Sequence, residues 1–134
     1  MNDGEQGLRK DCPFCREGFE DRCVAREGSV LAVRDRYPVT PLHTLVIPRR
    51  HVADYFDLLP GERADAETLL RRLRRVIREE DPSVTGFNVG INCGTAAGQT
   101  IMHVHIHLIP RREGDTPNPR GGVRGVIPGR RDYG

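Results

Sequence analysis

Short apolar segments separated by turn residues predict three strands in the first part of the chain. The first two are expected over residues 23–26 and 30–35, and Glu27-Gly28-Ser29 between them is typical of a hairpin turn. A third strand is expected at residues 42–47 and is ended by Pro48. Because the connecting turns are short, neighbouring strands are expected to run antiparallel.

One long amphipathic helix is predicted over residues 60–80. Its apolar positions recur at the spacing of one helical face and comprise Leu69, Leu70, Leu73, Val76 and Ile77. Pro60 suits the first turn of a helix, and Asp81-Pro82 ends it. A short helix is also expected around residues 52–56, in the connection that precedes the long one.

Two further strands are predicted after the long helix, over residues 87–92 and 101–109. Small residues at 94–98 form the loop between them, and Pro110 ends the second strand. A single antiparallel sheet crossed by one long helix and a short one makes the fold class α+β.

The chain is expected to contain one domain, over residues 1–110, with residues 1–10 flexible. Residues 111–134 are rich in proline and glycine and are expected to form an extended C-terminal arm, not a second domain.

Three histidines at alternate positions make the last predicted strand chemically distinctive. A strand reverses its side chains with period two, so His103, His105 and His107 are expected on one face. The apolar residues between them point to the other face and anchor the strand in the core. Clustered imidazoles suit proton transfer, metal binding or nucleophilic attack near neutral pH.

Composition indicates a small globular domain. The chain has 134 residues, of which 37% are hydrophobic and 30% are charged, and its net charge is +2. It contains no 18-residue apolar run and begins with no recognisable targeting segment, so a cytoplasmic location without membrane insertion is expected. Almost all basic residues are arginine, which is interpreted as coding bias more than phosphate recognition. Nucleic acid is therefore not expected as the main ligand.

Four cysteines in a cytoplasmic chain of this size do not predict a disulfide framework. Cys12 and Cys15 have the Cys-x-x-Cys spacing of a zinc half-site, because two thiolates on one tight turn can fill two tetrahedral positions. The same Cys-Pro-Phe-Cys motif occurs in glutaredoxin-like thiol redox proteins. Those proteins place it between a strand and a helix, and residues 7–11 and 16–20 predict neither element.

Residues 103–109 read His-φ-His-φ-His-φ-φ, where φ is apolar, and resemble the signature of the histidine triad (HIT) family. Asn92, residues 98–100, residues 42–48 and residues 49–52 also resemble family segments in order and spacing. The resemblance implies a HIT-like fold, a homodimer, and binding of purine nucleotides as small-molecule ligands.

The resemblance also implies nucleotide hydrolysis or transfer through a covalent nucleotidyl-histidine intermediate. His105, with an imidazole on each side, is the expected nucleophile. His107 is expected to donate to an α-phosphate oxygen, and His43 to pack beneath the triad and hold its tautomers. The substrate-binding candidates are Phe14 for the base, Asp35 for the ribose, and Asn92, Gly98, Gln99 and Thr100 for the phosphates.

Relatives with the cysteine pair resemble the galactose-1-phosphate uridylyltransferase branch, which implies a structural Zn²⁺ site. By position its ligands are Cys12, Cys15, His51 and His103.

The expected substrates are dinucleoside polyphosphates or nucleoside phosphoramidates, with nucleotidyl transfer left open. The alternatives are a nucleotide-binding module without catalysis and the redox protein described above.

Overall fold

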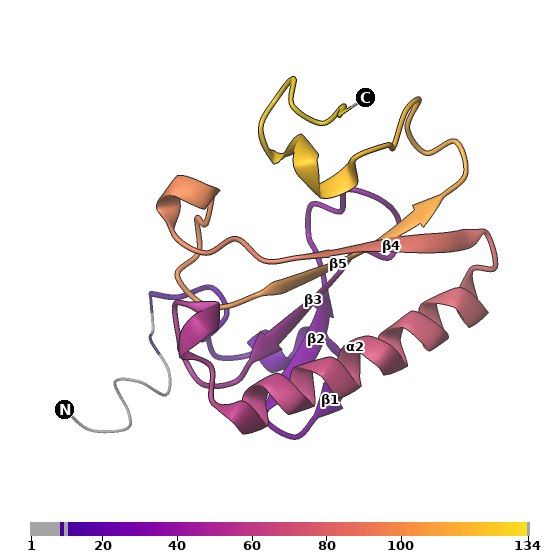
Figure 1. The fold of residues 1–134 in the computed structure, drawn as a ribbon. Coiled ribbons are helices and arrows are strands. Elements are labelled where there is room, and N and C mark those ends of the chain that lie inside the picture. Colours follow the sequence, from indigo (N-terminus) through magenta and orange to yellow (C-terminus); the bar gives the residue numbers. More distant parts are fainter. Residues whose placement is uncertain (1–8, 10, 134) are drawn as a thin grey trace.

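The computed structural model describes residue 9 and residues 11–133. Its centre is one five-stranded sheet with the strand order β1-β2-β3-β5-β4, in which each pair of neighbours is antiparallel (Figure 1). The strands are β1 (Cys23–Glu27), β2 (Val30–Arg34), β3 (Thr44–Pro48), β4 (Val84–Gly90) and β5 (Ile106–Arg112). The predicted α+β class is confirmed.

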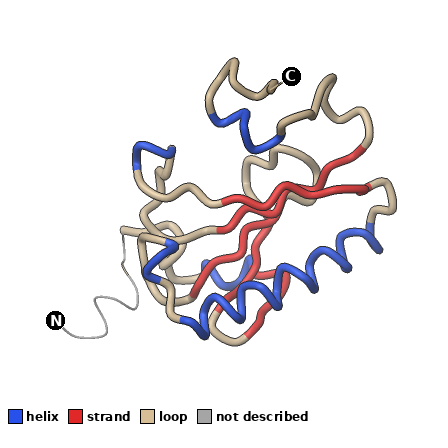
Figure 2. The backbone as a smooth tube through the Cα atoms, in the orientation of Figure 1, coloured by secondary structure: helices blue, strands red, loops and turns tan. Residues whose placement is uncertain are grey.

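The long helix α2 (Pro60–Glu80) runs across one face of the sheet (Figure 2). Its residues Leu69, Leu73 and Ile77 are buried against the sheet. Burying each such side chain contributes roughly 1.5–3 kcal/mol of transfer free energy to folding. Four short 3-10 helices complete the described elements: η1 (Phe19–Arg22), η2 (Tyr55–Asp57), η3 (Thr95–Ala97) and η4 (Gly122–Val126). No helix among the described residues is both long enough and apolar enough to cross a membrane.

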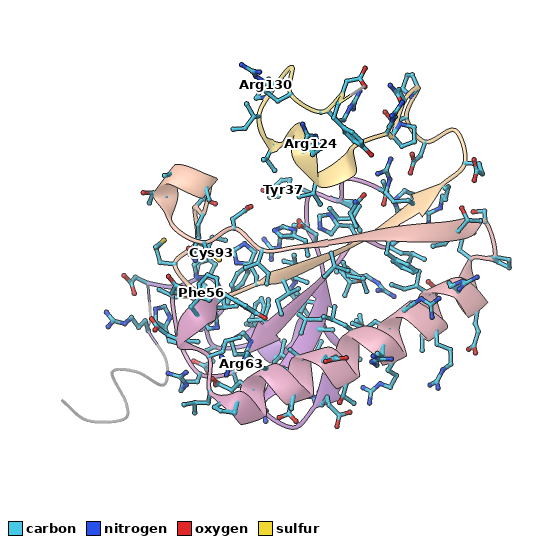
Figure 3. The ribbon with its side chains drawn as sticks, in the orientation of Figure 1. Tyr37, Phe56, Arg63, Cys93, Arg124 and Arg130 are labelled. Carbon is cyan, nitrogen blue, oxygen red and sulfur yellow. The ribbon has the colours of Figure 1, made fainter. Side chains whose placement is uncertain are left out.

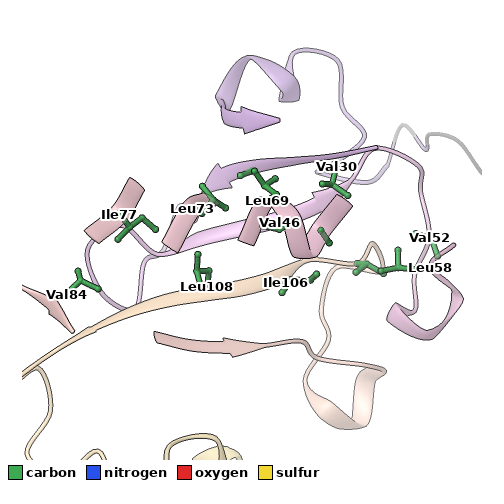
Figure 4. Packing of buried hydrophobic residues seen from close by; sticks show 13 residues of the cluster. Val30, Val46, Val52, Leu58, Leu69, Leu73, Ile77, Val84, Ile106 and Leu108 are labelled. Atoms are coloured by element: carbon green, nitrogen blue, oxygen red, sulfur yellow. The ribbon is translucent and has the colours of Figure 1, made fainter. Parts of the chain in front are cut away.

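The alternation of side chains along the strands divides the core between the two faces of the sheet. Val46, Ile106 and Leu108 face α2 and belong to the larger cluster (Figure 4). Leu45 and Ile47 face away from the helix and pack with Phe19 in a smaller cluster. His107 lies between Ile106 and Leu108 in β5, so its side chain emerges on the face that α2 leaves open.

The predicted boundaries of β5 are wrong at both ends. The chain bends at residues 101–103, and β5 begins only at Ile106, so one strand does not carry all three histidines. β5 also continues through Pro110. Proline has no backbone N–H to donate, but the β3–β5 ladder has already ended at Leu108, so no ladder bond is lost at Pro110. The Pro110 carbonyl accepts a hydrogen bond from the Thr40 hydroxyl.

Two other elements differ from their predicted ranges. β4 covers residues 84–90 instead of 87–92, because it pairs with β5 from Arg112 back to His107. The short helix expected at 52–56 is η2, where the Asp54 carboxylate accepts the N–H of Phe56 and caps the turn.

The C-terminal segment is not an extended arm. It turns back above the sheet, on the side opposite α2, and η4 contacts β4 (Figure 1). Gly121 has φ 89°, and a Cβ atom there would collide with the Arg131 carbonyl. The Tyr133 ring lies against the guanidinium groups of Arg120 and Arg124, at 5.1 and 4.9 Å. The predicted flexible residues 1–8 and 10 lie outside the described residues.

Candidate active site and metal centre

A pocket of about 1340 Å³ opens on the face of the sheet away from α2. It brings together eight predicted site residues from separate parts of the chain: Phe14, Asp35, His43, Asn92, Gly98, Thr100, His105 and His107. The wall is completed by the C-terminal segment, from which Val123 and Arg131 line the pocket. Sequence patterns contain no signal for this contribution, because it depends on how the segment folds back.

The tautomer of His105 is set by its own backbone. Nδ1 lies 2.8 Å from the carbonyl oxygen of His103, so Nδ1 carries the proton and donates it. In a neutral imidazole this leaves a lone pair on Nε2. The rings of Phe14 and His107 each approach His105 edge-on, with centroids 5.2 Å away, and restrict its rotation.

A hydrogen-bond chain sets the tautomers of His43 and His107. The backbone N–H of Val39 donates to His43 Nδ1 at 3.0 Å, so the His43 proton resides on Nε2. His43 Nε2 lies 2.9 Å from His107 Nδ1 and donates to it. His107 is thereby left with its proton on Nε2, as a hydrogen-bond donor in the pocket.

The same chain argues against a metal ion among Asp35, His43 and His107, whose donor atoms are close enough together to suggest one. A metal on His43 Nε2 would require an imidazolate, because Nδ1 already accepts from Val39. The cluster is therefore a proton-ordering network.

Both histidines are held neutral. Burial lowers the pKa of His107 to about 4 and also lowers the pKa of His43, in each case against a smaller opposing effect of the Asp35 carboxylate. A neutral pair keeps the one-way hydrogen-bond chain intact at physiological pH.

The lowered pKa of His107 predicts acid sensitivity. The unfolded chain binds a proton at this residue below about pH 6.5, whereas the folded chain does so only near pH 4. The free energy of unfolding should therefore fall as the pH is lowered across this window. Urea unfolding of wild type and His107→Gln between pH 4.5 and 7.5 measures the effect. The free energy of unfolding is expected to fall more steeply with decreasing pH in wild type than in the variant. Parallel curves would contradict the lowered pKa of His107.

Asp35 contacts both the loop after β2 and the His43 ring. Its Oδ1 accepts the backbone N–H of Tyr37 at 2.8 Å, and its Oδ2 lies 3.5 Å from His43 Nε2. Asp35 also lines the pocket, and its contact with a ribose stays a prediction.

Gln99 does not line the pocket. Its side chain is 5% exposed, and its Oε1 accepts the N–H of Gly94 at 2.8 Å. Its Nε2 donates to the carbonyl oxygens of Ala53 and Ile101. Both ends of the amide are occupied, so Gln99 braces the loop before β5 and has no donor left for the predicted phosphate contact.

The second centre joins the N-terminal turn to the segment before β5. Cys12, Cys15, His51 and His103 place one donor atom each within 4.8 Å of one another. Sγ of Cys15 lies 3.3 Å from Nδ1 of His51 and 3.4 Å from Nδ1 of His103. Cys12 Sγ is 3.5 Å from the same His103 nitrogen. This Cys₂His₂ cluster can hold a metal ion.

The groups around this cluster orient its ligands. His103 Nε2 donates to the Pro48 carbonyl at 2.8 Å, which leaves Nδ1 unprotonated and aimed at the two sulfurs. Burial lowers the pKa of His103 to about 4. Next to it, Arg50 forms a bidentate pair with the buried Glu62, at 2.8 and 3.0 Å. Sequence reasoning missed Pro48, Arg50 and Glu62, because nothing in their spacing connects them to His103.

The redox alternative lacks its physical requirements. Cys12, the first thiol of the motif, is buried, whereas the attacking thiol of a redox motif must be reached by its substrate. Residues 11–18 form turns and lead into the 3-10 helix η1, not into an α-helix whose N-terminus would stabilise a thiolate. Cys93 is not one of the four clustered residues and lies on the loop before η3 (Figure 3).

Comparison with known proteins identifies the family. A family model described as the HIT domain matches residues 17–114, which include the sheet, α2 and all three triad histidines. The chain belongs to the HIT family. The resemblance noted in the histidine pattern is thereby confirmed for most of the chain.

The similar curated proteins include two nucleotide enzymes. The chain is 46% identical over 78 residues to the asymmetrical bis(5'-nucleosyl)-tetraphosphatase of Schizosaccharomyces pombe, covering 58% of this HIT chain and 42% of the relative. It is 40% identical over 97 residues to AP-4-A phosphorylase of Mycobacterium tuberculosis, covering 72% and 49%. The chain thus matches about half the length of these relatives.

Solved HIT structures confirm the fold. A zinc-bound histidine triad family protein from Mycobacterium smegmatis superposes with a TM-score of 0.65 at 38% identity, covering 72% of this chain and 69% of that one. A HIT family protein from Bacillus anthracis superposes with a TM-score of 0.71 at 36% identity, covering 78% and 76%.

Proposed function

We propose that this HIT protein is a purine nucleotide phosphohydrolase that attacks the α-phosphate of dinucleoside polyphosphates or nucleoside phosphoramidates. The observation that carries the proposal is the tautomer of His105, whose unprotonated Nε2 belongs to a pocket large enough for a nucleotide. The names of the relatives, a tetraphosphatase and a phosphorylase of dinucleoside polyphosphates, support this substrate class.

The reaction proceeds in two displacements at phosphorus. The Nε2 lone pair of His105 attacks the α-phosphorus, a P–N bond forms, and the bond to the leaving group breaks. His107 donates its Nε2 proton in a hydrogen bond to a non-bridging phosphate oxygen, where negative charge develops. A water molecule then attacks the phosphorus of the nucleotidyl-His105 intermediate and loses a proton to solvent. The P–N bond breaks, neutral His105 is restored, and a nucleoside monophosphate is released.

The remaining pocket residues bind the substrate. Asp35 accepts hydrogen bonds from the ribose hydroxyls, and Phe14 packs against the base. Asn92, Gly98 and Thr100 contact the phosphates, at a loop where glycine allows close approach of the backbone. Gln99 is left out of these contacts because its amide is occupied by backbone groups.

We propose Zn²⁺ as the metal at Cys12, Cys15, His51 and His103. Tetrahedral zinc holds sulfur and nitrogen ligands about 3.6 Å apart, given typical Zn–S and Zn–N distances. The observed separations of 3.3–3.5 Å fit this value. One unprotonated nitrogen facing two sulfurs is also better satisfied by a shared cation than by hydrogen bonds. When bound, zinc has a structural role, joining the N-terminal turn to the segment that carries His105.

We also propose a homodimer and a cytoplasmic location. β4 is an end strand of the sheet, and its exposed Val89 lies on an edge that a second copy can pair with. Thiol ligands at Cys12 and Cys15 suit a reducing compartment. Light scattering of the purified protein tests the dimer, and cell fractionation tests the location.

Parallel kinetics on three substrates test the proposed activity. Diadenosine tetraphosphate, diadenosine triphosphate and an adenylyl-lysine amide are incubated with and without inorganic phosphate. AMP among the products indicates hydrolysis, whereas ADP formed only with phosphate indicates phosphorolysis by transfer to that acceptor. Tight binding without turnover, unchanged in His105→Asn, would support the alternative of a non-catalytic binding module and overturn the proposal.

A further inference from the structure

The loop of residues 36–42, between β2 and β3, carries the group that orders the catalytic histidines. Its Val39 N–H donates to His43 Nδ1. This donor, together with the Asp35 carboxylate 3.5 Å from His43 Nε2, sets the direction of the hydrogen-bond chain through His43 to His107. If Val39 moved away, the His43 proton would be free to reside on Nδ1. His43 Nε2 would then accept from His107 Nδ1, and His107 would present a lone pair, not a proton, to the α-phosphate.

Besides the backbone bond from the His43 N–H to the Thr40 carbonyl at 3.1 Å, three hydrogen bonds made by hydroxyl and guanidinium groups hold this loop in place. The Thr40 hydroxyl donates to the Pro110 carbonyl of β5 at 2.6 Å, directly beside Val39. Arg112, also in β5, donates to the Pro41 carbonyl at 3.1 Å. The Thr44 hydroxyl donates to the Leu42 carbonyl at 2.8 Å.

The loop is held in this shape against a local preference. Leu42 has φ 71°, in the left-handed region, which is unfavourable for a residue with a Cβ. Such a conformation persists only where the surroundings over-determine it. Leu42 directly precedes His43, so the orientation of the His43 side chain depends on the hydrogen bonds that hold the loop.

We propose that Thr40 is a positioning residue, whose bond to Pro110 keeps the Val39 N–H on His43 and thereby keeps the His107 proton on Nε2. Thr40 is half-buried, and the carbonyl that accepts its hydroxyl proton belongs to Pro110, in the same strand as His107, so the bond fixes the loop relative to that histidine. The role in catalysis rests on the proposed function, whereas the control of the tautomers does not.

The test compares Thr40→Val, which removes the hydroxyl but keeps the branched shape, with Thr40→Ser, which keeps the hydroxyl. Long-range ¹H–¹⁵N NMR of the imidazoles reads the tautomers directly. Wild type and Thr40→Ser are expected to show His43 and His107 each protonated at Nε2. Thr40→Val is expected to show a mixture at both residues, with kcat lowered roughly 10- to 100-fold and KM little changed.

Two further variants keep the proposal falsifiable. Thr40→Ala is measured in parallel in case Thr40→Val does not fold. Leu42→Gly removes the steric cost of the left-handed conformation and keeps the hydrogen bond from Thr40 to Pro110. The tautomers of His43 and His107 in this variant are therefore expected to match those of wild type. A single tautomer and an unchanged kcat in both hydroxyl-deleted variants would overturn the proposal. A mixed tautomer in a protein whose wild type turns over none of the substrates would leave Thr40 positioning intact and remove the proposed function instead.

Discussion

His105→Asn is expected to lower kcat on diadenosine polyphosphates by roughly 10⁴-fold or more, because the variant has no nucleophile to form the covalent intermediate. The substrate Kd should change little, since the phosphates, ribose and base retain their other contacts. Rapid quench with labelled substrate should trap nucleotide on wild-type protein and none on the variant. Steady-state and single-turnover kinetics measure both effects.

The matched control is Arg75→Gln, an exposed position on α2 across the sheet from the pocket. It should retain wild-type turnover and the trapped intermediate. Recovery of product from wild type with no nucleotide-modified protein at any quench time would rule out the two-displacement route. Retention of more than a tenth of the activity by His105→Asn would rule out its role as nucleophile.

Removal of zinc is expected to lower the melting temperature by roughly 10 °C or more. A metal present at about 1,000 times its Kd contributes about 4 kcal/mol to the folded state, and a domain of this size loses several degrees for each kcal/mol. Cys15→Ser should have the same effect without chelator, because it replaces one of the two proposed thiolate ligands. Elemental analysis should give one zinc per chain for wild type, and calorimetry gives the melting temperatures.

Cys23→Ser provides the control for this experiment. The Cys23 thiol donates to the Ala25 carbonyl at 2.8 Å within β1 and takes no part in the metal cluster. A serine hydroxyl can make the same bond, so zinc content and melting temperature should match wild type. A wild-type protein purified without added metal that contains no zinc, and that melts at the same temperature in chelator, would contradict the structural zinc site.

The long helix and the five strands could be predicted from local patterns, because their apolar residues recur at helical or strand spacing between turn residues. Leu69, Leu73 and Ile77 repeat at helical spacing, and the hairpin turn at Gly28 separates two short apolar strands. The ends of β5 could not, since the strand begins where pairing with β3 begins and passes through Pro110 only because β3 stops short of it.

The metal cluster and the pocket illustrate the same division. The spacing of Cys12 and Cys15 predicts half of a zinc site, and the resemblance to relatives implied His51 and His103 as the other two ligands. The structure brings the four donor atoms within 4.8 Å of one another. Gln99 was predicted to bind phosphate, but only the structure reveals that its amide is occupied by backbone groups.

The sequence by itself determined the α+β architecture, the HIT family and the residue types available for catalysis, because these follow from periodicity and from motifs of neighbouring residues. Only the tertiary structure decided which nitrogen of each histidine carries its proton. That choice depends on partners distant in sequence or set by local bends, such as Val39 for His43, the His103 carbonyl for His105 and His43 for His107. A hydrogen bond has a direction, and no one-dimensional pattern encodes the position of the atom at its other end.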